Sequence, residues 1–162
     1  MAASTIVKNL TDGQLTLKDG TGSPVTLVVG FDMGDFTVSG LAQSLHEVAA
    51  YESRGTFKSA RRTTRRYPSG SFSLMLTDIT DGTDQTVIDF LLKQGSYAAN
   101  VSTLAGDVYC VDLQLDVEGT DLGDSADHQI ALSKCHCVVD VAEGDPDTIT
   151  VNYTCYGSVT MT

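Results

Sequence analysis

Apolar and polar side chains alternate along most of this chain, and the alternation is clearest between residues 108 and 117. Apolar residues fill every second position there, namely Tyr109, Val111, Leu113, Leu115 and Val117. The intervening positions hold Cys110, Asp112, Gln114 and Asp116. Because successive side chains of a β-strand point to opposite faces, the pattern predicts a strand with one buried and one wet face.

The same period of two recurs elsewhere and predicts a mainly β chain. A second clear strand starts at Ile149, where apolar side chains alternate with polar ones as far as Tyr156. Short apolar runs predict the remaining strands, which are Thr5–Leu10, Gln14–Lys18, Val25–Val29, Asp35–Val38, Ser71–Thr77 and Ile130–Val141. Asp12-Gly13 and Asp19-Gly20 have the composition of hairpin turns between the first of these strands.

One segment has the spacing of a helix instead. Between Asp84 and Gln94 the apolar residues recur at intervals of one helical turn, and Gly95 follows as a stop. Thr83 or Asp84 would cap its first turn. We therefore predict one domain over residues 1–162, an antiparallel β-sandwich or barrel flanked by a single amphipathic α-helix.

The stretch from about 41 to 70 lacks a strong pattern and is predicted to be a long basic loop, a kind of segment that usually has a function or a partner. Six of the ten basic residues of the chain lie in it: Arg54, Lys58, Arg61, Arg62, Arg65 and Arg66. No acidic residue lies between 54 and 66, and the chain outside these positions has four basic and twenty-one acidic residues. The basic run is either a solvated loop or an arm that contacts the acidic body of another copy.

Motifs of common enzyme sites are missing from the sequence. It has no nucleophile elbow, phosphate-binding loop, dinucleotide fingerprint or His-Glu-x-x-His pair, and its three histidines have no evident catalytic partners. We expect neither enzymatic activity nor a cofactor. An acidic body also repels phosphate, so we expect no specific nucleic-acid binding by the domain.

The cysteines resemble a metal site only in part. In Cys135-His136-Cys137 the strand pattern places both sulfurs on one face with Ala131, and the imidazole on the other, whereas structural zinc sites use Cys-x2–4-Cys pairs. We predict that Cys135, Cys137 and Cys155 are buried free thiols without a metal, with an internal disulfide as the alternative. The aspartates at 78, 81 and 84 lack the order of a calcium loop, which leaves calcium a minor alternative to a solvated turn.

Cys110 differs from the other cysteines because the alternation places it on the polar face with Asp112 and Asp116. It is therefore the candidate for a cross-link between copies. No apolar run approaches the roughly 18 residues of a membrane helix. The first residues lack the pattern of a secretory signal, so we expect assembly in a cytoplasm.

Several motifs between residues 10 and 95 follow one another in an informative order. They are the strand–turn–strand Leu15–Leu27, the Gly-Asp-Phe-Thr-Val of 34–38, Glu52 with Arg54-Gly55, the Ser-Phe-Ser strand of 71–78, and the helical positions 87–92. In order and spacing they resemble bacteriophage tail tube (major tail) proteins. The C-terminal third agrees only in being rich in β-strands. The basic character of 58–66 and the four cysteines depart from the family pattern.

This resemblance implies a β-sandwich whose copies form six-membered rings, with inner strands joined across subunits into a closed barrel. Rings would stack into a tail tube of a virion, together with other tail proteins, after assembly in the host cytoplasm. Genomic DNA would pass through a carboxylate-lined bore without specific binding. Asp112, Gln114 and Asp116 would face this lumen, and the cations of 54–66 would contact an adjacent subunit or ring.

Two other classes of protein fit the same residues less completely. A monomeric β-sandwich that acts as a binding or decoration module explains the strands and the acidity, but gives the basic run no role. A small β-barrel enzyme would need catalytic residues that the sequence does not present.

Overall fold

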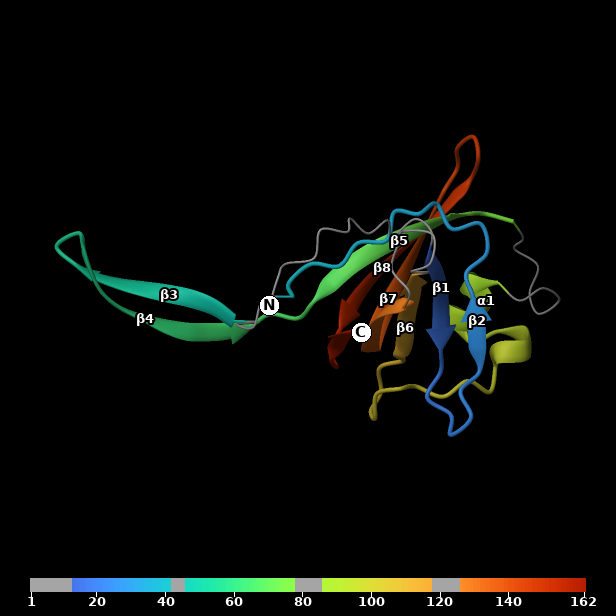
Figure 1. Ribbon diagram of the computed structural model, residues 1–162, viewed down its shortest axis with the longest axis horizontal. Coiled ribbons are helices and arrows are strands. Elements are labelled where there is room, and N and C mark those ends of the chain that lie inside the picture. The colour runs from blue at the N-terminus through green and yellow to red at the C-terminus, as the bar shows by residue number, and fades with distance from the viewer. Residues whose placement is uncertain (1–12, 42–45, 78–85, 118–125) are drawn as a thin grey trace.

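The computed structural model describes residues 13–41, 46–77, 86–117 and 126–162. It contains a seven-stranded sheet, a separate two-stranded sheet that projects from the body, and one short α-helix (Figure 1). All the strand pairs among these residues are antiparallel, and the strands described form no closed barrel. The predicted fold class, mainly antiparallel β with one flanking helix, is confirmed.

The larger sheet has the strand order β2-β1-β6-β7-β8-β5, with β9 beside β7. Its strands are β1 (Gly13–Lys18), β2 (Thr26–Val28), β5 (Ser69–Met75), β6 (Val111–Val117), β7 (His128–Ala142), β8 (Thr148–Cys155) and β9 (Val159–Met161). The predicted strand Thr5–Leu10 lies outside the described residues. Asp35–Val38 is not a regular strand, but its backbone hydrogen-bonds the edge of β5, where the Thr37 N–H donates to the Ser71 carbonyl over 2.9 Å.

A bulge divides the long strand β7 into two halves. Opposite β6, Leu132 pairs with Leu113 and Cys135 pairs with Val111, so that β7 has two residues, Ser133 and Lys134, where β6 has one. Lys134 takes a left-handed conformation with φ 58°. The half before the bulge pairs with β6 and β9, and the half after it pairs with β8. Bulges of this kind bend a strand and increase its twist.

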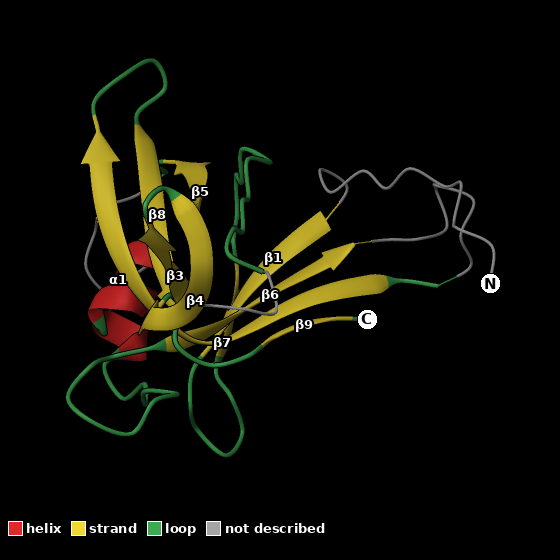
Figure 2. Ribbon diagram, turned by 90° about the vertical axis from the view of Figure 1, so that its left-hand side faces the viewer, coloured by secondary structure: helices red, strands yellow, loops and turns green. Residues whose placement is uncertain are grey.

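The extra residue reverses which side chains of β7 face the core. Leu132 before the bulge and Cys135 after it are both buried, although they are three positions apart. Ala131 pairs with Gln114 and shares its polar face, so the interpretation that placed Ala131 on one face with Cys135 and Cys137 is wrong. That interpretation assumed an unbroken strand. The two halves of the sheet diverge in Figure 2, and they enclose the core between them.

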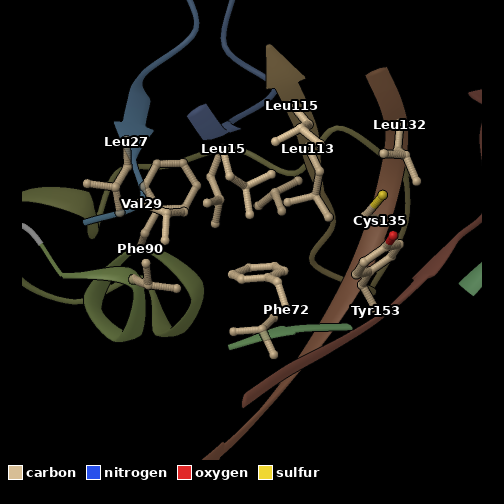
Figure 3. Close-up of a cluster of buried hydrophobic side chains, with 14 of the residues drawn as sticks. Leu15, Leu27, Val29, Phe72, Phe90, Leu113, Leu115, Leu132, Cys135 and Tyr153 are labelled. Carbon is tan, nitrogen blue, oxygen red and sulfur yellow. The ribbon is translucent and has the colours of Figure 1, made fainter. Parts of the chain in front are cut away.

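The core draws side chains from both halves of the sheet and from the helix. Leu15 and Leu113 come from one half, Phe72 and Tyr153 from the other, and Phe90 from α1 (Figure 3). The predicted buried face of β6 is confirmed, because Val111, Leu113, Leu115 and Val117 are all buried.

Helix α1 (Val87–Leu92) is shorter than predicted and has different caps. Thr86 precedes it, and its hydroxyl accepts a hydrogen bond from the Asp89 N–H over 3.1 Å. The predicted caps Thr83 and Asp84 lie outside the described residues. Lys93 ends the helix in a left-handed conformation, whereas Gly95, the predicted stop, begins the 3-10 turn η2 (Gly95–Tyr97). Phe90, which the apolar spacing did not single out, is fully buried.

The segment predicted to be a long basic loop contains a two-stranded hairpin instead, and this corrects the interpretation of residues 41–70. Strand β3 (His46–Ser53) pairs with β4 (Thr56–Arg65). Arg54 and Gly55 form its turn. Their φ angles of 51° and 74° are both positive, as in the type I′ turn that commonly joins two hairpin strands. The ten residues of β4 are all exposed. Neither face is buried, so the sequence shows no alternation that would predict strands.

Asp19 anchors the connection between β1 and β2, which is longer than the predicted Asp19-Gly20 turn. Its buried carboxylate accepts hydrogen bonds from the Val25 N–H at 2.7 Å, the Thr21 hydroxyl at 2.8 Å and the Val101 N–H at 3.1 Å. Burial raises the pKa of this carboxyl group, but the hydrogen bonds to the ionised form outweigh it and leave the pKa below its ordinary value. Asp19 thus joins two connecting segments that are distant in sequence.

We predict that Asp19→Ala lowers the free energy of unfolding by about 1–3 kcal/mol at neutral pH, because it leaves buried N–H groups without acceptors. The folded-state pKa lies below the unfolded value, so the stabilisation by the charged form is present above pH ~4 and is lost as pH falls through the folded pKa. Urea denaturation at pH 7 and at pH 3 should therefore show a smaller difference between parent and variant at pH 3. An equal difference at both values would contradict this role.

Candidate functional site

Two surfaces of the molecule have the features of assembly contacts. The first, the polar sheet face, is the side of β1, β6, the first half of β7, and β9 that points away from the core. Its residues include Gln14, Thr16, Lys18, Asp112, Gln114, Asp116, Gln129, Ala131 and Thr160. The second, the arm, is the β3–β4 hairpin with the adjoining Arg66.

Side chains on the polar sheet face are linked across three strands. The Lys18 ammonium donates to Gln114 Oε1, and Gln114 Nε2 donates to both carboxylate oxygens of Asp116 at 2.8 Å. Gln129 Nε2 donates to Asp116 Oδ1 at 2.7 Å. Such a network fixes the orientation of its members. Asp116 is thus held in place on the face that points away from the core, where it remains half-buried.

Asp112 has a structural role that the sequence did not reveal. Its Oδ1 accepts a hydrogen bond from the Lys134 N–H at 2.8 Å. That N–H belongs to the bulge of β7, where the regular ladder to β6 is interrupted. The carboxylate therefore supplies the acceptor that the bulged backbone needs.

The arm has no core of its own. Val48 and Phe57 are each 61% exposed, and Tyr51 is also exposed. In the described structure its two strands form a sheet separate from the main one, and Figure 1 shows them extending away from the body. Because a lone two-stranded hairpin is marginally stable in water, the arm is a surface that would gain stability from a partner.

The cations predicted to make subunit contacts are gathered on this arm. Arg66 pairs with Glu47 at 3.0 Å, and the Arg65 guanidinium lies over the Tyr67 ring, 5.0 Å from its centroid. Within the described residues, the side chains of the remaining four form no hydrogen bond or ion pair: Arg54, Lys58, Arg61 and Arg62.

Two of the three cysteines predicted to be buried are buried, and the third is not fully so. Cys135 and Cys155 are buried and face each other in register across β7 and β8, and Cys137 is only partly buried. All four thiols are free. A hydrogen bond to Cys155 and burial both raise the pKa of Cys135.

The prediction that Cys110 lies on the polar face is wrong, because its side chain is fully buried. It precedes β6, and its backbone N–H binds the Ser102 hydroxyl at 2.9 Å instead of continuing the ladder. The alternation of β6 therefore does not extend to it. Burial raises the pKa of the thiol. The cross-link between copies stays a prediction.

Among the described residues, no group of three or more His, Cys, Asp or Glu side chains could hold a metal ion. The aspartates at 78, 81 and 84 lie outside that part of the chain. None of the described helices has the length and apolar character needed to cross a membrane.

No family model and no curated protein matches this sequence. Among the solved structures that match are two with a similar fold. One is a chain of the PVC sheath–tube complex of an extracellular contractile injection system in the extended state, with a TM-score of 0.55, 10% identity and 99% of each chain covered. The other is a chain of the sheath/tube terminator of such a system, with a TM-score of 0.51, 12% identity, and 92% of this chain and 93% of that chain covered. At these identities the likeness shows a common fold.

The structure thus brings Asp112, Gln114 and Asp116 together on one face and gathers the predicted cations on the arm. It adds Lys18 and Gln129 to the polar sheet face, which sequence reasoning missed. In β1 the polar residues Gln14, Thr16 and Lys18 alternate with Leu15 and Leu17, so the same pattern analysis could have identified Lys18. Residues 128–131 of β7 are all half-buried, and they offer no such signal for Gln129.

We predict that Asp112→Ala lowers the free energy of unfolding by about 1–2 kcal/mol, because the bulge N–H of Lys134 loses its acceptor. Asp112→Asn keeps a side-chain oxygen and is the matched control, with a smaller loss expected. Chemical denaturation of the three proteins measures this directly. If the alanine variant were as stable as the parent, the carboxylate would have no part in holding the bulge.

Proposed function

We propose that this chain is the structural subunit of a tail tube, in which hexameric rings stack around an acidic channel. The arm carries the proposal: it is exposed on both sides, basic, partly apolar and unsupported by the body. In a monomer the apolar side chains of the arm stay exposed to water, whereas a neighbouring subunit can cover them. The tail-tube resemblance of the sequence and the common fold with chains of sheath–tube structures support the same role.

Ring closure would use the edges of the half-sheet that carries the polar sheet face. In the described structure β2 and β9 pair with a strand on one side only. Open edges are templates for pairing with another chain. Copies joined edge to edge would bring the polar sheet faces into one continuous wall, and closure into a ring would leave no edge free.

The polar sheet face would line the channel. Asp112 and Asp116 would then face the bore, backed by a chain whose formal net charge is −11. Carboxylates repel phosphate, so genomic DNA would slide through such a channel without specific binding. In this proposal the protein works without catalysis, as part of a virion tail that is assembled with other tail proteins in the host cytoplasm.

Self-association tests this proposal against the alternative of a monomeric binding or decoration module. Sedimentation velocity over a range of concentrations should show rings or longer polymers, and negative-stain images should show six-fold end views. A compact monomer at every concentration, including crowded and low-salt conditions, would refute the tube and favour the monomeric module.

We predict that replacing Arg61, Arg62, Arg65 and Arg66 by Ser leaves the fold intact and impairs assembly. These side chains are exposed and outside the core, and each exposed ion pair contributes only ~0.2–1 kcal/mol, but a ring repeats every contact. Salt should weaken parent assembly in the same way, since the Debye length falls from about 10 Å at 0.1 M to about 3 Å at 1 M.

The matched control replaces the same four arginines by Lys, which keeps the charge. Circular dichroism and thermal unfolding check the fold of each variant, and sedimentation measures its assembly. If the Ser variant polymerised like the parent at every salt concentration, the basic run would be a solvated surface without a role in assembly.

A further inference from the structure

The tip of the β7–β8 hairpin is the densest acidic run in the described part of the chain. Four carboxylates lie between positions 140 and 147, where no lysine or arginine occurs and every residue is exposed. They belong to Asp140, Glu143, Asp145 and Asp147. We refer to residues 140–147 as the acidic tip.

The charges of the acidic tip are only partly compensated within the subunit. Asp140 accepts from Asn152 Nδ2 at 2.9 Å, and Asp147 accepts from the Gly144 N–H at 2.8 Å. Glu143 and Asp145 form no hydrogen bond or ion pair with the described residues. Asp112 and Asp116 differ, because bonds inside the subunit already hold them. The acidic tip is therefore the better acceptor for a basic partner.

The arm is complementary to the acidic tip in charge and in apolar character. Four of its cations have no partner among the described residues, as shown above. Exposed apolar side chains accompany the charges on both surfaces. Tyr51 and Phe57 lie on the arm, Val141 lies within the acidic tip, and Val138 precedes the tip. Interfaces between proteins commonly combine an apolar centre with a charged rim.

One subunit cannot make this contact with itself. In Figure 1 the arm extends to one side of the body, and the β7–β8 hairpin projects from a separate part of it. No pairing, hydrogen bond or ion pair joins the two among the described residues. Any contact between them has to join two copies.

We infer that the arm of one copy docks on the acidic tip of a second copy, with Arg61 and Arg62 against Glu143 and Asp145. This inference rests on the proposed function and names the surface that receives the arm. Electrostatic complementarity of this kind selects a partner surface and orients it.

Charge reversal on each side, alone and together, tests the contact. The arm variant carries Arg61→Glu and Arg62→Glu, the tip variant carries Glu143→Lys and Asp145→Lys, and a third protein carries all four changes. Each single-sided variant should raise the concentration needed for polymerisation by about tenfold or more, since attractions become repulsions. The quadruple variant should recover most of the lost polymerisation, because it restores opposite charges on the two surfaces. Thermal unfolding verifies that all three remain folded.

The outcomes separate this contact from the tube itself. If the parent polymerises and the tip variant polymerises equally well, the arm does not use the acidic tip. If both single-sided variants are impaired and the quadruple variant does not recover polymerisation, the arm binds another surface. The tube proposal then stands without this contact. A parent chain that stays monomeric overturns the proposed function and this inference together.

Discussion

The bulge at Ser133 and Lys134 is the constraint on which the rest of the subunit depends. It reverses the side-chain alternation of β7. One strand can therefore bury both Leu132 before the bulge and Cys135 after it, although the two are three positions apart. Opposite the break, in the connection between β8 and β9, the Gly157 N–H donates to the Ser133 carbonyl at 3.0 Å. A β-carbon at Gly157 would lie 2.5 Å from that carbonyl oxygen, which explains the glycine there.

The bend produced by the bulge also separates the two surfaces proposed to act in assembly. One half of the sheet carries the polar sheet face and the edges β2 and β9, and the other half leads through β8 to the acidic tip. Asp112 takes part in both the bulge and the polar sheet face. It accepts a hydrogen bond from the Lys134 N–H of the bulge, and it lies on the polar sheet face. One residue proposed to line a channel thus also helps to hold the bulge.

Sequence reasoning succeeded where one face of a strand is buried and failed where neither is. The alternation of β6 correctly separated Leu113 and Leu115 from Asp112 and Asp116. The arm was predicted to be a loop because its strands bury no face, and Cys110 was misplaced because the alternation was extended past the end of β6. The bulge escaped detection, since a single inserted residue in an apolar strand changes the burial pattern without a turn signal.

The most direct test of this account is a cryo-electron microscopy map of the assembled protein that resolves side chains. The account predicts rings of six subunits whose polar sheet faces line the channel, with the Asp112 and Asp116 carboxylates toward the bore. An assembly that placed these two residues on the outer wall, or one without a central channel, would contradict it.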